Sequence, residues 1–297
     1  MQLYKQKEEQ QVELIDRILE SENIEAAIRA VERNQGAPGI DKKPVGMLRT
    51  YFSEHGRENR EEIREKKYEP QPVRRVYIPK ANGKQRPLGI PTVVDRVIQQ
   101  AVAQVISRGY DRYFSENSHG FRPNRSCHTA MEKVLEYLNE GYEWVVDLDI
   151  EKYFDTVNHD KPISILRERV NDATTLHLIR SYLRAGVMEN GLVSATEEGV
   201  PQGGPLSPIL SNVYLDKFDK ELESRGLRFV RYADDCNIFV RSEMAANRVM
   251  ASTSSWLERK QEKSREADKQ QISGIHILEI ERRMEGETCG RSGCAEK

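Results

Sequence analysis

Apolar residues recur at helical spacing in three parts of the chain. Near the start they are Val12, Ile15, Ile18 and Leu19. After residue 92 they are Val94, Val97, Ile98, Ala101 and Val105. In "SPILSNVYLDKFDKEL" they are Leu210, Tyr214, Phe218 and Leu222. Spacings of three and four residues predict amphipathic helices that each turn one face to a core.

Local signals mark where these helices begin. Thr92 and Asp95 have the spacing of a capping box. Ser207 is predicted to be an N-cap with Pro208 at the first helical position. A further, highly charged helix is predicted over residues 54–67.

Alternating and short apolar runs predict strands between the helices. Residues 73–91 read as a hairpin around the Asn82-Gly83 turn. "EWVVDLDI" is a short buried strand that ends in acids, and residues 227–241 form a second hairpin with "ADD" at its turn. The alternation of these strands with helices indicates an α+β fold.

The length of 297 residues fits about two compact units. We expect a helical N-terminal extension over residues 1–50, a hairpin-and-helix unit over 51–140, a unit carrying the acids over 141–260 and a polar tail over 261–297. In that tail only "IHILEI" has core-like patterning.

Charge is balanced overall but uneven along the chain. The 46 basic and 48 acidic residues give a net charge of −2, which argues neither for nor against an anionic partner. Residues 71–133 hold 11 Lys and Arg against 4 Asp and Glu. Such a stretch suits a phosphate backbone, and the alternative is an ordinary solvated basic face.

Neither a disulfide framework nor a membrane segment is evident. The four cysteines lack framework spacing, no apolar run reaches the roughly 18 residues of a membrane span, and the first residues are polar. We therefore expect a cytoplasmic protein with no membrane partner. Its oligomeric state, monomer or homodimer, is left open.

The paired acids Asp234 and Asp235 point to metal chemistry. With a third acid from the strand at residues 143–150 they would form the oxygen-rich set that Mg²⁺ prefers. Asp149 is the first candidate for that third ligand, and Asp147, one step back on the same face, is the second. Such a site supports phosphoryl transfer. The alternative is a solvent-exposed Asp-Asp turn.

Other residues fit a nucleotide beside that metal. Lys80 and Arg86 lie on opposite arms of the first hairpin and can converge on a triphosphate, although a salt-bridged surface hairpin would have the same pattern. The glycines of "PQGGP" allow close approach to a base pair, and Gln202 beside them can both donate and accept; a plain loop is the alternative. An aromatic ring from Tyr153 or Phe154 under a bound sugar would exclude a 2′-hydroxyl, unless both are core residues.

Five segments, taken in order, resemble a known family. They are "IPKANGKQRPLGIPTVVDRVIQQ", "SHGFRPNRSCHTA", "VVDLDIEKYFDTVNHD", "GVPQGGPLSPILSNVYLD" and "RYADD". Together they look like a group II intron-encoded reverse transcriptase, also called a maturase, over residues 24–260. The early "NQGAPGID" resembles the N-terminal extension of that family. The resemblance implies a right-hand polymerase fold with fingers at 51–140 and a palm at 141–260, the palm an antiparallel sheet packed on helices.

The resemblance also implies site residues and partners. The metal ligands would be Asp149, Asp234, Asp235 and the carbonyl of Ile150. The nucleotide contacts would be Lys80, Arg86, the backbone of Lys152 and Tyr153, the sugar gate Phe154, and Gln202. The template contacts would be Arg122, Pro123 and Gly203. The partners would be dNTPs, an RNA template with a DNA primer, and group II intron RNA.

The tail departs from the family pattern. After "SSWLERK" the family continues with a lysine-bearing strand, a primer-gripping hairpin and a helical thumb, none of which residues 261–297 match. We therefore expect no thumb, and a tail that is a truncation or an out-of-frame end. The alternative functions are a non-catalytic RNA-binding maturase fragment that assists splicing, and another lineage such as a retron or defence-associated reverse transcriptase.

Overall fold

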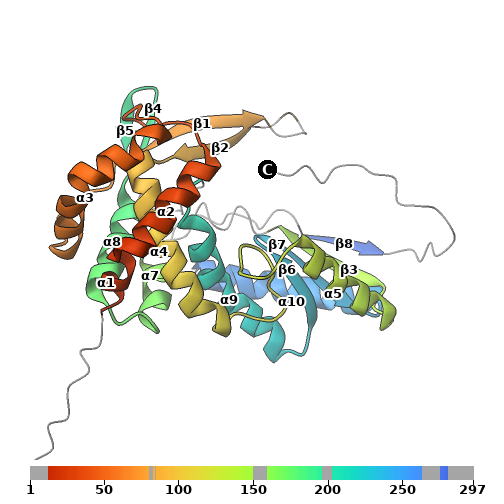
Figure 1. Ribbon diagram of the computed structural model, residues 1–297. Helices are drawn as coiled ribbons and strands as arrows, with labels where there is room; N and C mark the ends of the chain where they lie inside the picture. The colour runs from red at the N-terminus through yellow and green to blue at the C-terminus, as the bar shows by residue number, and fades with distance from the viewer. Residues whose placement is uncertain are drawn as a thin grey trace, which may run out of the picture.

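The computed structural model describes residues 13–79, 83, 85–149, 159–195, 203–262 and 275–279. It has two lobes with separate hydrophobic cores and one helix that belongs to both (Figure 1).

The first lobe is a helical cluster built around one central helix. That helix is α4 (Val93–Tyr110), and around it lie α1 (Leu14–Leu19), α2 (Ser21–Asn34), α3 (Leu48–Arg64), α7 (Asp160–Arg167) and α8 (Ala173–Arg184). The predicted apolar stripe of α4 is buried, so its amphipathic pattern extends into a helix surrounded on most sides. The predicted N-terminal helix is two helices that meet at Glu20, and the charged helix begins at Leu48 rather than at residue 54.

A four-stranded sheet with the order β2-β1-β4-β5 lies at one end of this lobe. The predicted hairpin forms it with β1 (Val73–Pro79) and β2 (Gln85–Ile90), paired antiparallel. A second hairpin of β4 (Val187–Glu189) and β5 (Leu192–Ser194) joins it, with β4 parallel to β1. The 3-10 turns η1 (Val45–Met47) and η2 (Asp111–Tyr113) complete the lobe.

The start of α4 is fixed by buried polar bonds. Thr92 is the predicted N-cap, and its hydroxyl oxygen accepts from the Asp95 backbone N–H at 3.1 Å. The Asp95 carboxylate in turn accepts from the hydroxyls of Thr92 and Tyr68 and from the Gln71 N–H. Burial raises the pKa of Asp95. This acid therefore ties the entry to β1 to the first turn of α4.

The second lobe is a four-stranded antiparallel sheet between helices. Its strands β3 (Trp144–Asp149), β6 (Arg228–Tyr232), β7 (Asp235–Val240) and β8 (Ile275–Glu279) have the order β6-β7-β3-β8. Helices α9 (Ser207–Ser224) and α10 (Glu243–Glu262) cover one face, and α5 (Cys127–Asn139) packs on the other. The sequence β3-α9-β6-β7-α10-β8 is the split βαβ arrangement of ferredoxin-like folds.

Helix α9 joins the two cores. Its early residues Ile209 and Val213 lie in the first core, whereas Phe218 and Leu222 lie in the second. Ser207 is the first helical residue rather than the predicted N-cap; Leu206 precedes the helix and no side chain caps it. Pro208 is therefore the second helical residue rather than the predicted first one. The helix therefore holds the lobes together through packing along its length.

Two predicted boundaries differ from the arrangement in space. Helices α7 and α8 fall in the segment 141–260, yet their apolar residues pack into the first core. The segment 261–297 was expected to be a polar tail, but its "IHILE" forms β8 and pairs with β3. The tail therefore contributes the fourth strand that closes the split βαβ unit. Residues 280–297 lie outside the described part.

The role of β8 can be tested with two neighbouring residues on opposite faces. Ile277 packs against the second core, whereas Leu278 is 52% exposed. Replacing Ile277 with Lys should lower the free energy of unfolding by about 1–3 kcal/mol because it places a charge against an apolar core. Leu278→Lys is the matched control and should change it little. Equal effects on urea unfolding curves would show that β8 does not pack as described.

Candidate active site at the acid turn

The two paired acids lie at the turn between β6 and β7. Ala233 adopts a left-handed conformation with φ of 59°, Asp234 follows it in the turn, and Asp235 is the first residue of β7. Asp235 lies opposite Tyr232 on one side and opposite Asp149 on the other. Residues directly opposite in antiparallel strands have Cβ atoms about 4.5–5.5 Å apart. The backbone therefore brings Asp149 beside the acid pair.

The register also separates the two candidates for the third acid. Asp147 lies opposite Asn237, two residues further along β7 from the turn. Since a strand rises about 3.3 Å per residue, Asp147 is about 7 Å further from the turn than Asp149. The backbone favours Asp149. Its side chain lies outside the described part, and the described side chains contain no cluster of three or more His, Cys, Asp or Glu. The three-acid metal site thus stays a prediction.

A buried arginine fixes the turn from beneath. Arg231 and Asp219 of α9 are both 0% exposed and form a two-point ion pair, with Nε to Oδ1 at 2.8 Å and an Nη2 to Oδ2 at 2.7 Å. The other guanidinium N–H groups donate to Asn212 Oδ1, the Ser118 hydroxyl and the Ala233 carbonyl. All five N–H donors of Arg231 are therefore matched, and one of them holds the residue before Asp234.

The two acids near this arginine, Asp216 and Asp219, differ in how they interact with it. Asp216, one helical turn from Asp219, is partly buried, and burial together with the Asp219 charge raises its pKa to about 6. Asp219 receives both parallel N–H bonds from Arg231, the geometry that favours a carboxylate. Asp219 is accordingly the acid that pairs with the buried guanidinium.

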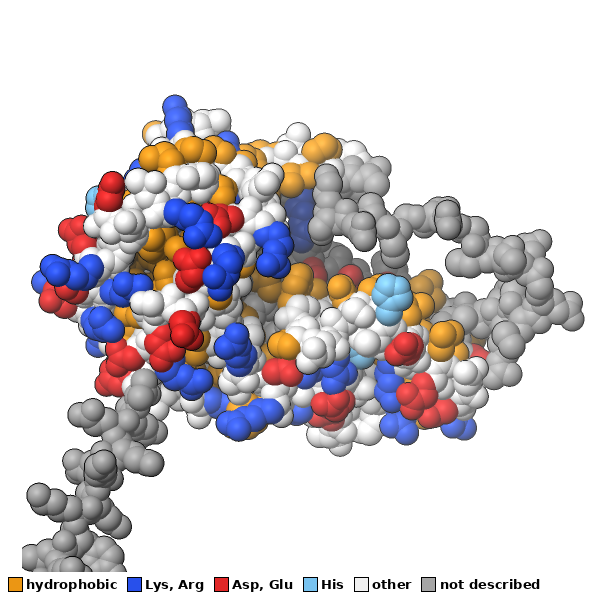
Figure 2. Space-filling model, viewed as in Figure 1, with side chains coloured by type: hydrophobic (Ala, Val, Ile, Leu, Met, Phe, Trp, Pro, Cys, Tyr) orange, Lys and Arg blue, Asp and Glu red, His pale blue; other side chains and the backbone are white. Residues whose placement is uncertain are grey.

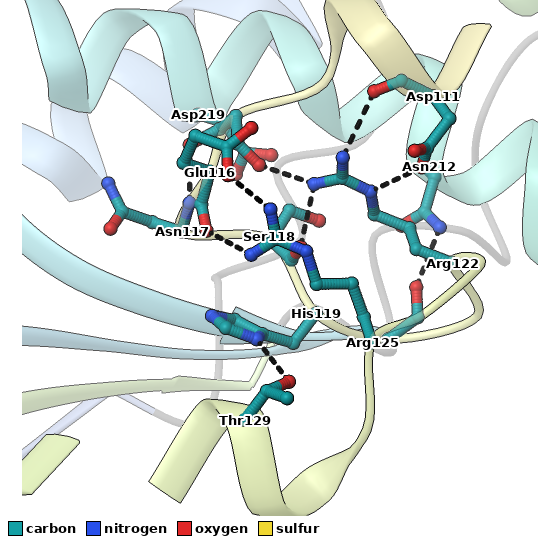
Figure 3. A network of polar contacts seen from close by, with 12 residues as sticks. Asp111, Glu116, Asn117, Ser118, His119, Arg122, Arg125, Thr129, Asn212 and Asp219 are labelled. Atoms are coloured by element: carbon teal, nitrogen blue, oxygen red, sulfur yellow. Dashed lines mark hydrogen bonds and ion pairs between the residues drawn. The ribbon is translucent and has the colours of Figure 1, made fainter. Parts of the chain in front are cut away.

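The loop before α5 packs against the same turn. Its backbone pairs with Arg231, because the His119 N–H donates to the Arg231 carbonyl and the Arg231 N–H donates to the Asn117 carbonyl, both at 2.8 Å. A Cβ on Gly120 would overlap the backbone of Ala233, so only glycine allows this approach. The Gly120 carbonyl accepts from Asn212 at 2.8 Å. Figure 3 shows this loop between α9 and Thr129 of α5.

Arg122 holds this loop from inside. Its side chain is 2% exposed and donates to both Asp111 Oδ1 and the Asp111 carbonyl (Figure 3). It also donates to the carbonyls of Ser115 and Ser118 at 2.5 and 2.8 Å. These bonds argue against the predicted contact between the Arg122 side chain and a template. Pro123, the next residue, is exposed, and its predicted contact stays open.

A groove of about 1000 Å³ begins at the acid turn and runs between the lobes. Figure 2 shows the hollow there, with Lys and Arg side chains at its edge on the first lobe. The groove is lined by Asp234 together with Asn34, Arg86, Arg96, Gln104, Arg108, Phe121, Pro123 and Gly203, among others. Five residues predicted for the site thus meet in one groove although they come from distant parts of the sequence: Arg86, Arg122, Pro123, Gly203 and Asp234.

The glycine pair has a packing role in addition to its place in the groove. A Cβ on Gly203 would overlap the Gly89 carbonyl of β2, and one on Gly204 would overlap the Gln99 side chain of α4. Gly203 also has φ of 116°, which other residues rarely adopt. The glycines therefore let the start of α9 lie against β2 and α4, and the predicted contact of Gly203 with a template remains untested.

Several predicted site residues lie outside the described part of the chain. They are Lys80, Ile150, Lys152, Tyr153, Phe154 and Gln202. Nothing in the geometry therefore bears on the predicted triphosphate pair, the sugar gate or the glutamine contact beyond the position of Arg86.

The predicted basic surface is partly an interior feature. Arg96 is buried, and its guanidinium donates to the carbonyls of Ala37 and Gly36, while Arg74 donates to the Pro38 carbonyl at 2.8 and 3.1 Å. Burial lowers the pKa of Arg96. Together with Arg122, these arginines bind main-chain oxygens, so the excess of basic residues in 71–133 overstates the charge presented to solvent.

Within the part of the chain that is described, no helix has the length and apolar character to cross a membrane.

The Arg231 brace should dominate the stability of the second lobe. Arg231→Met leaves Asp219 buried without a partner and should lower the free energy of unfolding by about 3–5 kcal/mol. The double variant Arg231→Met/Asp219→Leu should recover part of that loss because no unpaired charge remains. The control is Arg228→Met, an exposed residue of the same strand, which should cost less than about 1 kcal/mol. A double variant less stable than both singles in urea unfolding would contradict this account.

Comparisons with known proteins identify the family. Residues 78–274 match the family described as "Reverse transcriptase (RNA-dependent DNA polymerase)". Protein YkfC of Escherichia coli is 40% identical over 220 residues, which are 72% of this chain and 58% of that protein. The group II intron-encoded protein LtrA of Lactococcus lactis is 44% identical over 165 residues, which are 55% of this chain and 27% of that protein.

A solved structure has the same fold. A chain of a partial Cas6-RT-Cas1–Cas2 complex superposes with a TM-score of 0.51 at 25% identity, covering 84% of this chain and 43% of that one. The present chain thus spans from about a quarter to somewhat over half of the length of these relatives. The match over most of its residues and the intron-encoded relatives agree with the two-lobed fold, and the chain belongs to the reverse transcriptase family, within the group of group II intron-encoded reverse transcriptases and maturases.

Proposed function

We propose that this chain is an RNA-directed DNA polymerase, which extends a DNA primer on an RNA template with dNTPs. The observation that carries the proposal is the register that sets Asp149 opposite Asp235, next to Asp234 at the head of the groove. Membership in the family supports a nucleic-acid partner and a need for a divalent metal.

Asp149, Asp234 and Asp235 are proposed to hold Mg²⁺. Carboxylates on adjacent strands fit this ion because it prefers oxygen ligands. Since the sheet already holds the strands in place, little conformational entropy is lost when these ligands bind the ion. Mg²⁺, when bound, supplies the charge stabilisation that phosphoryl transfer requires. The brace under Ala233 then has a mechanistic consequence: it fixes the turn from which Asp234 projects before any ligand arrives.

The remaining predicted residues are assigned to the nucleotide and the strands around it. Arg86 lines the groove and can form a bidentate contact with a phosphate, with Lys80 as its proposed partner across the hairpin. The backbone carbonyl of Ile150 is proposed as a further metal ligand. The backbone of Lys152 and Tyr153 is proposed to line the nucleotide pocket, and Phe154 is proposed as the sugar gate that favours deoxynucleotides. Gln202 and Gly203 are proposed to lie against the nucleotide and template.

The acids provide the decisive test of polymerase activity. Primer extension on an RNA template should require Mg²⁺, and Asp234→Asn and Asp149→Asn should each lower the rate at least about a hundredfold because each removes a metal ligand. Asp147→Asn is the matched control on the same strand and face and should retain most activity. Equal activity of wild type and Asp234→Asn would refute the proposal, and loss with Asp147→Asn alone would move the third ligand to that residue.

A second candidate function is RNA binding that assists intron splicing without polymerisation. The groove favours it because Arg86 and Arg108 line its walls whether or not the acids hold metal. Group II intron RNA is the proposed ligand, supported by intron-encoded relatives.

Salt and acid dependence separate this function from the first. RNA binding should survive Asp234→Asn, weaken steeply as salt rises, and show a shallower salt dependence in Arg108→Gln because fewer phosphate contacts release counterions. The exposed Arg57→Gln, on α3 and outside the groove lining, is the control. Fluorescence anisotropy with a labelled intron RNA gives the affinity, and binding insensitive to salt would contradict an RNA-binding groove.

A further inference from the structure

Phe121 has a backbone conformation that its residue type does not favour. Its φ is 56°, in the left-handed region, where a bulky side chain is a real outlier and glycine or asparagine is the usual residue. The turn alone would therefore be better served by glycine. Because strain of this kind persists where the surroundings enforce it, the side chain itself needs an explanation.

The residues on both sides of Phe121 enforce the conformation. Gly120 is packed against Ala233 and bonded to Asn212, and Arg122 is anchored by bonds to Asp111 and two loop carbonyls. Phe121 is thus the residue between two fixed points. The same contacts that hold the acid turn also determine where this ring projects.

The ring projects to solvent rather than into a core. Phe121 is 61% exposed, and it lines the groove together with Asp234, Gly203 and Arg86. An exposed phenylalanine is unremarkable by itself on a protein surface. Here the exposed ring of Phe121 belongs to a residue with a strained backbone, its two neighbours in the chain are anchored, and it lines the groove that also contains the catalytic candidate Asp234.

We infer that Phe121 is a stacking residue for an unpaired nucleobase of the RNA strand in this groove. An aromatic ring offers a flat apolar face that every base can stack on, and single-stranded nucleic acid is commonly bound through such rings next to basic side chains. This inference rests on the proposed nucleic-acid function. It moves the strand contact of the "HGFRP" segment from Arg122, which is committed to internal bonds, to the neighbouring ring.

Substitution by glycine separates a stacking role from a structural one. Phe121→Gly removes the ring and also relieves the left-handed strain, so the protein should remain folded. Its affinity for a single-stranded RNA should nevertheless fall about tenfold. Phe121→Trp should keep the affinity within about threefold because it restores an aromatic face. Leu135→Ala, which changes an apolar residue of α5 that is similarly exposed and lies outside the groove lining, is the matched control and should bind as wild type does.

The measurement combines affinity with a stacking signal. A fluorescein-labelled RNA reports affinity by anisotropy, and a 2-aminopurine base in the same RNA should be quenched by wild type and Phe121→Trp but much less by Phe121→Gly at saturation. Binding of Phe121→Gly equal to wild type, equally weak binding by the Trp and Gly variants, or no binding of RNA by wild type would each overturn the inference. The binding assay contains no dNTP, so it tests the stacking inference even if the protein does not polymerise. If the protein extends primers normally and Phe121→Gly binds RNA as wild type does, the stacking inference fails and the proposed polymerase function stands.

Discussion

The guanidinium of Arg231 is the interaction on which the second lobe and the acid turn both depend. A fully buried charge is unfavourable unless it is paired and its hydrogen-bonding groups are all satisfied. Arg231 meets both conditions with Asp219, Asn212, Ser118 and the Ala233 carbonyl. These partners come from α9, the loop before α5 and the turn itself. The requirement to satisfy one cation therefore fixes three segments relative to one another.

This constraint also explains why the loop before α5 is unusual. The backbone of this loop pairs with that of Arg231, its Gly120 packs against Ala233, and its Arg122 donates to carbonyls within the loop. Such a loop cannot relax one part without disturbing the acid turn. The left-handed Ala233 accepts from Arg231, and the left-handed Phe121 lies between Gly120, which packs against Ala233, and the internally bonded Arg122. Rigid support of this kind is what a site needs when charged groups must be in place before a ligand binds.

Much of the fold follows from local patterns in the sequence. The stripe of α4, its Thr92 cap, both predicted hairpins and the strand of Asp149 are where periodicity and turn residues indicate. What patterns do not contain is which segments pack together. Helices α7 and α8 lie within the predicted palm segment but bury their apolar faces in the first core, because packing depends on the path of the chain and not on its order. Likewise the apolar run "IHILE" is too short to be assigned to a sheet from the sequence alone. Its place becomes clear only from the structure, where it pairs with the edge of β3.

The residues of the candidate site also fall into those that the sequence predicts and those that it does not, and the reason is electrostatic. Two adjacent acids can be recognised in a sequence as a candidate metal site because their mutual repulsion favours binding of a cation. Arginine does not, since it is usually at the surface and its guanidinium can serve equally well as a phosphate ligand or as an internal brace. Arg122 lies in a motif that suggests contact with a template, yet its guanidinium makes four internal bonds. Arg231 lies in a strand beside the acids and is not among the residues predicted for the site. A charged residue next to apolar neighbours in a strand, as in "FVRYADD", is the pattern that could have indicated it, because alternation places Arg231 on the same face as Phe229.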